Sequence, residues 1–168
     1  DNTKAARLCK QRWPAVRDAV LRAHPWNCAA AQAVLAASAT PPAFRWASAF
    51  PLPTDCLRVL QATVGGGVVE AWETQGESLC CGESGPLELC YIRRLDDPRL
   101  YDSLLCEALA ARLSATLAYP LTASTSLGQA FWNLYADKLR EARGVDAREA
   151  SPIPVPAPTS WLAAKVGR

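Results

Sequence analysis

The sequence has a single histidine, His24, and no methionine. Hydrolysis by a Ser/His/Asp or Cys/His arrangement would have to use His24 as its base, because the chain offers no second imidazole. His24 precedes Pro25 at the end of a helix-like segment and lies close in sequence to Trp26. A lone histidine in such a place more commonly caps a helix or packs in a core, so we expect this chain not to be an enzyme.

Long apolar runs and a strong charge imbalance are also lacking. No stretch approaches the roughly 18 consecutive apolar residues that a membrane-spanning helix requires, so we expect no membrane partner. The formal net charge of +2 is too small to indicate nucleic-acid binding by itself. The residues that follow Asp1 do not have the pattern of a signal peptide. Composition alone therefore indicates neither a membrane protein nor a dedicated nucleic-acid-binding protein.

Seven cysteines are present, an odd number that does not fit the even count usual in secreted disulfide scaffolds. We expect free thiols in a reducing cytoplasm, where cysteine packs as a small apolar residue. Cys80 and Cys81 are adjacent and Cys90 stands nine residues further on, a spacing that suits zinc poorly. The glycines at 65–67 lack the lysine and Ser/Thr of a phosphate-binding loop. The sequence thus predicts no metal site and no cofactor.

The first helix is expected over residues 3–23, capped by Asn2 or Thr3. Apolar residues at helical spacing share one face, namely Cys9, Trp13, Val16, Val20 and Ala23. Pro14 lies inside this pattern and predicts a kink or two helical pieces. The other faces are basic, and Lys10 and Arg17 on them predict a surface that meets DNA or a neighbouring subunit.

Two further helices are predicted near the end of the chain. One spans residues 98–119, opened by Asp97 and Pro98 and closed by Tyr119 and Pro120, and its wide apolar stripe is typical of a helix buried on most sides. The next spans 126–148, after a short polar turn, and Trp132 on it is expected to fill the core. Such a short connection indicates that the two helices pack antiparallel.

The middle of the chain, residues 44–94, has the texture of an antiparallel β-rich portion. Prolines and glycines interrupt it, and between them lie short runs of strand character at 44–50, 57–64, 68–72, 79–81 and 87–94. In the last run Leu87, Leu89 and Tyr91 alternate with residues that point to the opposite face. Segment 28–39 is rich in alanine and is compatible with a helix or with an extended piece.

The chain ends in a segment with proline at every second position from 152 to 158, followed by Trp161 and Leu162. Proline at this density favours an extended form. We predict a docking arm at 151–168 that contacts a partner through Ile153, Val155, Trp161 and Leu162. The predicted fold is therefore α+β: mainly a helical bundle with an inserted antiparallel β-rich portion, forming one domain over residues 1–150, and an extended C-terminal arm.

Several stretches, in order along the chain, resemble the tail tubular protein A family, the gatekeeper or head-to-tail connector adaptors of tailed bacteriophages. The opening helix at 3–9 and 16–27 runs into Trp26-Asn27, as in the family, although Cys28 stands where the family often has phenylalanine. Residues 50–59 are similar to the family's entry to a strand. Residues 91–102, the helix at 104–117 and residues 131–143 complete the resemblance, which covers nearly the whole chain.

The resemblance implies a ring, commonly of twelve copies, that lies between the portal of a DNA-filled capsid and the tail and extends the DNA channel. It implies three partners besides the other copies: the portal protein, a downstream tail protein such as a nozzle or tail-tube component, and passing genomic DNA bound without sequence specificity. The implied location is the head-tail junction of the virion, after assembly in the host bacterial cytoplasm. The alternative from the residues is a small cytoplasmic cysteine-dependent enzyme or thiol sensor, which requires a low-pKa thiol beside His24.

Overall fold

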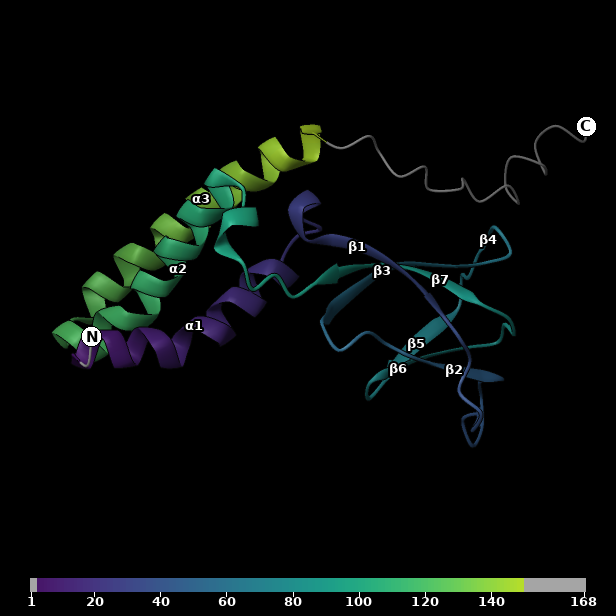
Figure 1. Cartoon of the computed structure of the whole chain (residues 1–168). Coiled ribbons are helices and arrows are strands. Elements are labelled where there is room, and N and C mark those ends of the chain that lie inside the picture. The colour runs from purple at the N-terminus through teal and green to yellow at the C-terminus, as the bar shows by residue number, and fades with distance from the viewer. Residues whose placement is uncertain (1–2, 150–168) are drawn as a thin grey trace, which may run out of the picture.

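The computed structural model describes residues 3–149, and these adopt an α+β fold with three helices at one end and two antiparallel sheets at the other (Figure 1). The helices are α1 (Lys4–Arg22), α2 (Ser103–Thr122) and α3 (Thr125–Glu149), with 3-10 turns at Asn27–Ala29 and Pro98–Leu100. The strands are β1 (Ala30–Leu35), β2 (Ser48–Pro51), β3 (Cys56–Val64), β4 (Gly67–Val68), β5 (Trp72–Gln75), β6 (Ser78–Cys81) and β7 (Leu87–Arg93). The predicted fold class is confirmed, whereas the arm residues Ile153, Val155, Trp161 and Leu162 lie outside the described residues.

Helix α1 begins after Thr3, whose hydroxyl accepts a hydrogen bond from the Ala6 amide at 3.2 Å. Its buried side includes Val16 and Val20, as the spacing predicted. The helix is continuous through Pro14, and Figure 1 shows it changing direction along its length. Of the two outcomes that Pro14 predicted, the structure therefore has the bent helix, because one missing amide donor leaves the neighbouring turns intact.

Helix α2 begins five residues later than predicted. Asp97 caps only the 3-10 turn at Pro98–Leu100, since Tyr101 then returns the backbone to an extended conformation. A second aspartate, Asp102, starts α2, and its carboxylate accepts hydrogen bonds from the amides of Leu104 at 2.8 Å and Leu105 at 3.4 Å. The predicted start at 98 was wrong because two aspartate caps stand close together and only the second leads into α-helix.

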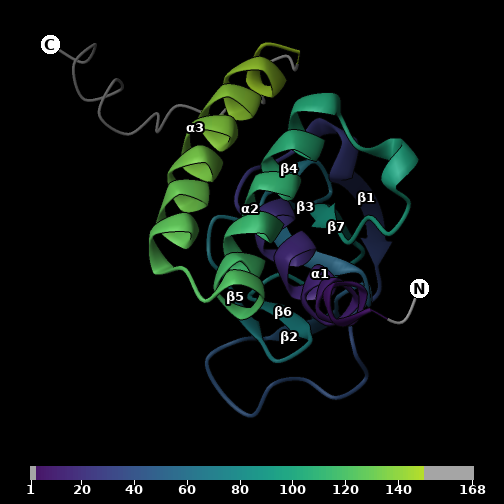
Figure 2. The ribbon, with the colours of Figure 1, turned by 90° about the vertical axis from the view of Figure 1, so that its left-hand side faces the viewer.

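Helix α2 also runs further than the predicted end at 119, through Pro120 to Thr122. Ala123 closes it in the left-handed conformation, with a φ of 56°, and its amide donates to the Tyr119 carbonyl at 2.8 Å. A two-residue connection leads to α3, whose bounds are close to the predicted 126–148. The two helices lie side by side in both views, as the short connection predicted (Figures 1 and 2).

By length and composition alone α2 could cross a membrane, which the search for an unbroken apolar run did not anticipate. The helix carries Glu107 and Arg112 and packs against both α1 and α3. Core helices pass the same test. Only 33% of this apolar stretch is buried within residues 3–149, so the predicted burial on most sides is not met there.

One sheet has the strand order β1-β7-β3-β4 and the other the order β2-β6-β5, and every neighbouring pair is antiparallel. Strand β1 comes from the alanine-rich segment that was compatible with helix or extended structure. It pairs with β7 along its length, from Ala30 opposite Ile92 to Leu35 opposite Leu87. The β-rich portion therefore begins before residue 44, and the predicted strand at 68–72 is divided between β4 and β5.

Strand β7 contributes to two apolar cores. Its side chains Leu87, Leu89 and Tyr91 pack between the two sheets, where Phe50 and Leu79 are fully buried. On the opposite face of the strand Ile92 is fully buried among side chains of the helices, which lie at the near end of the molecule in Figure 2. The predicted alternation along 87–94 is thus confirmed, and it places the helices and the sheets against one shared strand.

Candidate functional site

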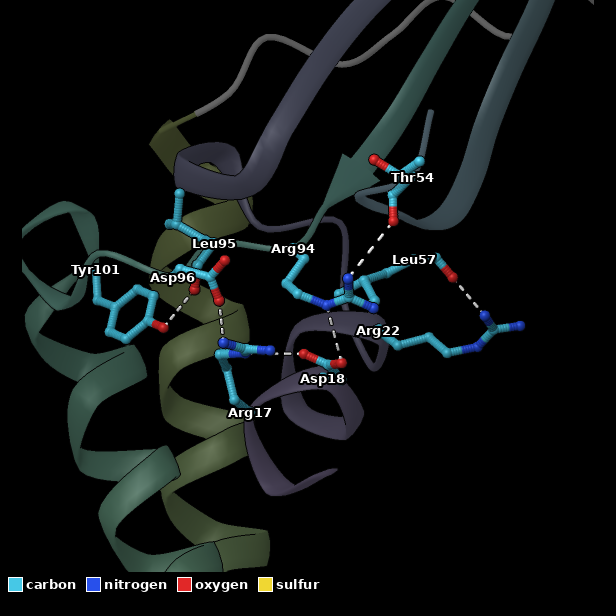
Figure 3. Close-up of polar contacts among 9 residues, drawn as sticks. All are labelled: Arg17, Asp18, Arg22, Thr54, Leu57, Arg94, Leu95, Asp96 and Tyr101. Carbon is cyan, nitrogen blue, oxygen red and sulfur yellow. Dashed lines mark hydrogen bonds and ion pairs between the residues drawn. The ribbon is translucent and has the colours of Figure 1, made fainter. Parts of the chain in front are cut away.

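A chain of charged side chains joins α1 to the β-rich portion (Figure 3). Asp18 accepts from Arg17 Nε at 2.8 Å and from Arg94 Nε at 3.1 Å. Arg17 also pairs with Asp96, and Arg22 donates to the carbonyl of Leu57 in β3. Each cation therefore has an anion or a carbonyl as partner across the boundary between helix and sheet. We call these residues the polar junction.

The polar junction changes the interpretation of the basic face of α1. The Arg17 side chain is only 10% exposed and its guanidinium pairs with Asp18 and Asp96. It therefore cannot lie on an open surface for DNA or a neighbour, and this part of the predicted face is wrong. Local spacing could not reveal this burial, because Asp96 stands 79 residues from Arg17 along the chain. Lys10, about two turns earlier, is exposed and stays a candidate.

His24 is held in a second polar cluster. Its Nε2 lies 3.0 Å from Asp146 Oδ2, and its ring meets that of Trp26 edge-on at 4.7 Å. Asp146 also accepts from the Asn27 amide at 3.0 Å, and its carbonyl accepts from Asn27 Nδ2 at 2.8 Å. These bonds tie the end of α1 to the last turns of α3. The histidine thus has an evident structural use, and no pattern in the sequence could have paired it with Asp146.

The pKa of the thiol nearest to this cluster, Cys28, is shifted in the direction opposite to that of a nucleophilic cysteine. Burial raises the pKa of Cys28, with a smaller contribution from the charges of Asp146 and Asp102. Burial likewise raises the pKa of Cys56, Cys80 and Cys106. Attack by a cysteine needs the thiolate, which a raised pKa makes scarcer at neutral pH. Within residues 3–149 no three His, Cys, Asp or Glu side chains are placed to hold a metal ion.

A cleft of about 820 Å³ opens beside the polar junction, between the end of α1 and strands β3 and β5. Arg22, Arg58 and Arg94 line it, and Glu77 is the single carboxylate among its lining residues. The three guanidinium groups already donate to carbonyls, Arg58 to that of Arg22 at 3.4 Å and Arg94 to that of Thr54 at 3.5 Å. The arginines that line the cleft are therefore already used in hydrogen bonds within the protein.

Several large apolar side chains on the hairpin of α2 and α3 are exposed. Trp132, Leu134 and Leu127 on α3 are 45%, 44% and 37% exposed, and Tyr119 and Leu121 at the end of α2 are 61% and 41% exposed. We call these five residues the hairpin surface. Large apolar side chains left exposed on two helices that pack together are candidates for a protein contact.

Trp132 was expected to fill the core, and this expectation is wrong. The guanidinium of Arg112 lies 4.0 Å from the centre of the Trp132 ring and 5.2 Å from that of Tyr135. Arg112 of α2 thus forms a cation–π contact with the Trp132 ring, which remains partly exposed to solvent. Helical spacing alone could not distinguish a buried tryptophan from one that stands on an arginine.

A second apolar side chain protrudes from the loop between β1 and β2. Phe44 is 81% exposed, and the amide of Trp46 donates to its carbonyl at 2.9 Å across a three-residue turn. Arg45 at the centre of this turn has a φ of 73°, a conformation that costs a non-glycine residue energy. Glu73 holds the turn by pairing with Arg45 at 3.1 Å and accepting from Trp46 Nε1 at 3.3 Å. The loop thus leaves Phe44 in solvent. The strand predicted at 44–50 was wrong in its first part, because β2 begins only at Ser48.

Comparison with known proteins adds no assignment. No protein-family model matches the chain. No curated protein matches it either. The proposals that follow therefore depend on the residues, the fold and the surfaces described above.

Proposed function

We propose that this chain is a structural head-to-tail adaptor subunit of a tailed bacteriophage. Copies of it form a ring between portal and tail, and the ring extends the channel through which the genome passes. The subunit acts by burying apolar and aromatic surface against its neighbours and partners, and it makes and breaks no covalent bond.

The order of the elements supports this proposal. A basic first helix leads through Trp26-Asn27 into an antiparallel β-rich portion, and a pair of long helices follows. This is the order that the resemblance to the tail tubular protein A family implies. Trp26 of the shared Trp-Asn pair is fully buried and its Nε1 donates to the Val20 carbonyl at 3.0 Å. The stretch that carries the resemblance is therefore built into the fold.

The main support for the proposal is that large apolar side chains are exposed at both ends of the molecule. The hairpin surface belongs to the helices, whereas Phe44 protrudes from a loop of the sheets. In Figure 1 the helices and the sheets lie at opposite ends of the molecule. A ring needs unlike faces on each subunit, so that one face meets a different face of the next copy.

The other proposed contacts follow from position and charge. The exposed Lys10 is the residue of α1 that we propose to face the DNA channel or a neighbour. The arm with Ile153, Val155, Trp161 and Leu162 is proposed to bind the portal, and the opposite side of the ring to receive a nozzle or tail-tube component. The complete particle would carry the protein at its head-tail junction after assembly in the bacterial cytoplasm.

The decisive experiment is to measure the native mass of the full chain alone and after mixing with its cognate portal protein. A closed ring of about twelve copies bound to the portal is the expected result. A protein that stays monomeric in the presence of the portal would overturn the proposal. The result does not depend on whether a ring forms before the portal is added.

The role of the arm is tested separately with a chain that ends at Ala150. We expect this chain to keep its fold, since the described cores use no residue beyond it. It should lose binding to the portal. Unchanged affinity of the shortened chain would show that the portal contact lies elsewhere and would leave the ring itself in place.

A further inference from the structure

Strand β1 is an edge strand that lacks the usual protection of an edge. It pairs with β7 on one side. The Ala30 amide donates to the Asn27 carbonyl, and for residues 31–35 no backbone hydrogen bond to residues 3–149 other than those of the β7 ladder is present. Its sequence from Ala30 to Leu35 has no charge and no proline, and Val34 is 71% exposed. An uncharged apolar edge of this kind is a template for another strand, and proteins normally block or cover it.

The sequence of the chain contains a segment suited to cover such an edge. From 152 to 158 every second residue is proline, so the remaining N–H groups belong to Ile153, Val155 and Ala157. Successive residues of a strand direct their backbone groups to opposite edges, so these three donors share one edge. The prolines occupy the other edge, which can accept no further strand. Each of the three residues also precedes a proline, which disfavours helix and favours the extended backbone.

The end of α3 lies where this segment would have to start. Asp146 is hydrogen-bonded to the Asn27 amide at 3.0 Å, and Asn27 stands three residues before β1. Figure 1 shows the last turn of α3 close to the beginning of β1. An extended segment of eight residues spans about 26 Å, which exceeds the roughly 20 Å of a six-residue strand. Residues 151–158 of the same chain therefore have the length and the starting point to run along β1.

We propose that residues 151–158 pair with the free edge of β1 in the same chain, parallel to it, and form a fifth strand of that sheet. The prolines then close the new edge of the sheet. The strand also directs Trp161 and Leu162 towards the loop of Phe44, which follows β1. This last consequence rests on the proposed adaptor function, whereas the pairing itself does not.

Hydrogen–deuterium exchange of the full-length protein, without portal, tests the pairing. Val155→Pro removes the central donor that faces β1, and we expect those amides of residues 31–35 that point away from β7 to exchange about tenfold faster in this variant. Pro154→Val is the matched control, because it adds an N–H only on the far edge and should leave the exchange of β1 unchanged. Exchange in α2 monitors the fold and should be equal in all three proteins.

Equal exchange of β1 in the unchanged chain and in Val155→Pro would overturn the proposal. Repeating the measurement over a range of protein concentrations decides which chain supplies the segment. Protection that persists on dilution supports pairing within one chain, whereas protection that disappears would assign the segment to a neighbouring copy and overturn the proposal as stated. Because no portal is present, failure here is distinct from failure of the adaptor function.

Discussion

Asp146 is buried, and its two carboxylate oxygens meet the imidazole of His24 and the amide of Asn27. We expect Asp146→Ala to lower the free energy of unfolding by about 2–3 kcal/mol, because it leaves a buried N–H without its partner. Urea unfolding followed by circular dichroism measures the loss. Asp137→Ala is the control, since Asp137 forms an exposed pair with Arg140 and should cost less than about 0.5 kcal/mol. Equal losses in the two variants would contradict the importance of the cluster.

Two partly buried thiols, Cys28 and Cys56, make the free energy of unfolding depend on alkaline pH. Burial raises the pKa of Cys28 and of Cys56 in the folded chain, so the unfolded chain releases these protons at lower pH. The stabilisation is complete below the pKa of these thiols in the unfolded chain and is lost as the pH rises through their higher pKa in the folded chain. We expect the free energy of unfolding, measured in urea with a reductant, to fall from pH 8 to pH 10. A double Cys28→Ala and Cys56→Ala variant should fall less steeply, and an equal slope would refute this cause.

At the scale of the element, the strained turn at Arg45 offers a direct comparison. Arg45→Ala and Arg45→Gly both remove the contacts with Glu73 and with the Trp46 ring. Only glycine adopts the φ of 73° without strain. We therefore expect the glycine variant to be more stable than the alanine variant by about 1 kcal/mol. Thermal unfolding of the two proteins tests this, and equal stability would show that the turn relaxes once Arg45 is replaced.

The hairpin surface predicts a separation of folding from assembly. Trp132→Ser should cost about 1 kcal/mol of stability, since the indole is 45% exposed and loses mainly its contact with Arg112. The same variant should fail to form a ring on its portal, as native mass would show. Leu100→Ser is the control, because Leu100 is exposed but lies outside the hairpin surface. Full assembly of the Trp132 variant would show that Trp132 does not contribute to the proposed ring interface.

Local patterns predicted most of the elements, and failures occurred where distant residues decide. The spacing of Val16 and Val20 and the alternation of Leu87, Leu89 and Tyr91 predicted buried faces correctly, because these patterns follow from the geometry of one element. The burial of Arg17 depends on Asp96 and the role of His24 on Asp146, and these pairs are separated by 79 and 122 residues. Local spacing carries no information about such partners. The same limit explains why Trp132 was assigned to the core.

At the scale of the whole molecule, the helices and the sheets share one strand and one polar junction. Ile92 of β7 is fully buried in the core of the helices, together with partly buried Leu57 and Leu60 of β3. Neighbouring side chains of β7 fill the core between the sheets. Asp18 adds a bridge, since it pairs with Arg17 on its own helix and with Arg94 after β7. The two ends of the molecule are therefore expected to unfold as one unit.

This cooperativity can be measured by amide exchange at two remote positions, Leu109 in α2 and Leu79 in β6. In the unchanged chain both amides should report the same free energy of opening, because neither core survives without β7. Ile92→Ala should cost about 2–4 kcal/mol and lower the opening free energy at Leu109 more than at Leu79, since the cavity lies on the helical side. Leu89→Ala, on the other face of the strand, should show the reverse order. Two different opening energies in the unchanged chain would mean that each end folds by itself.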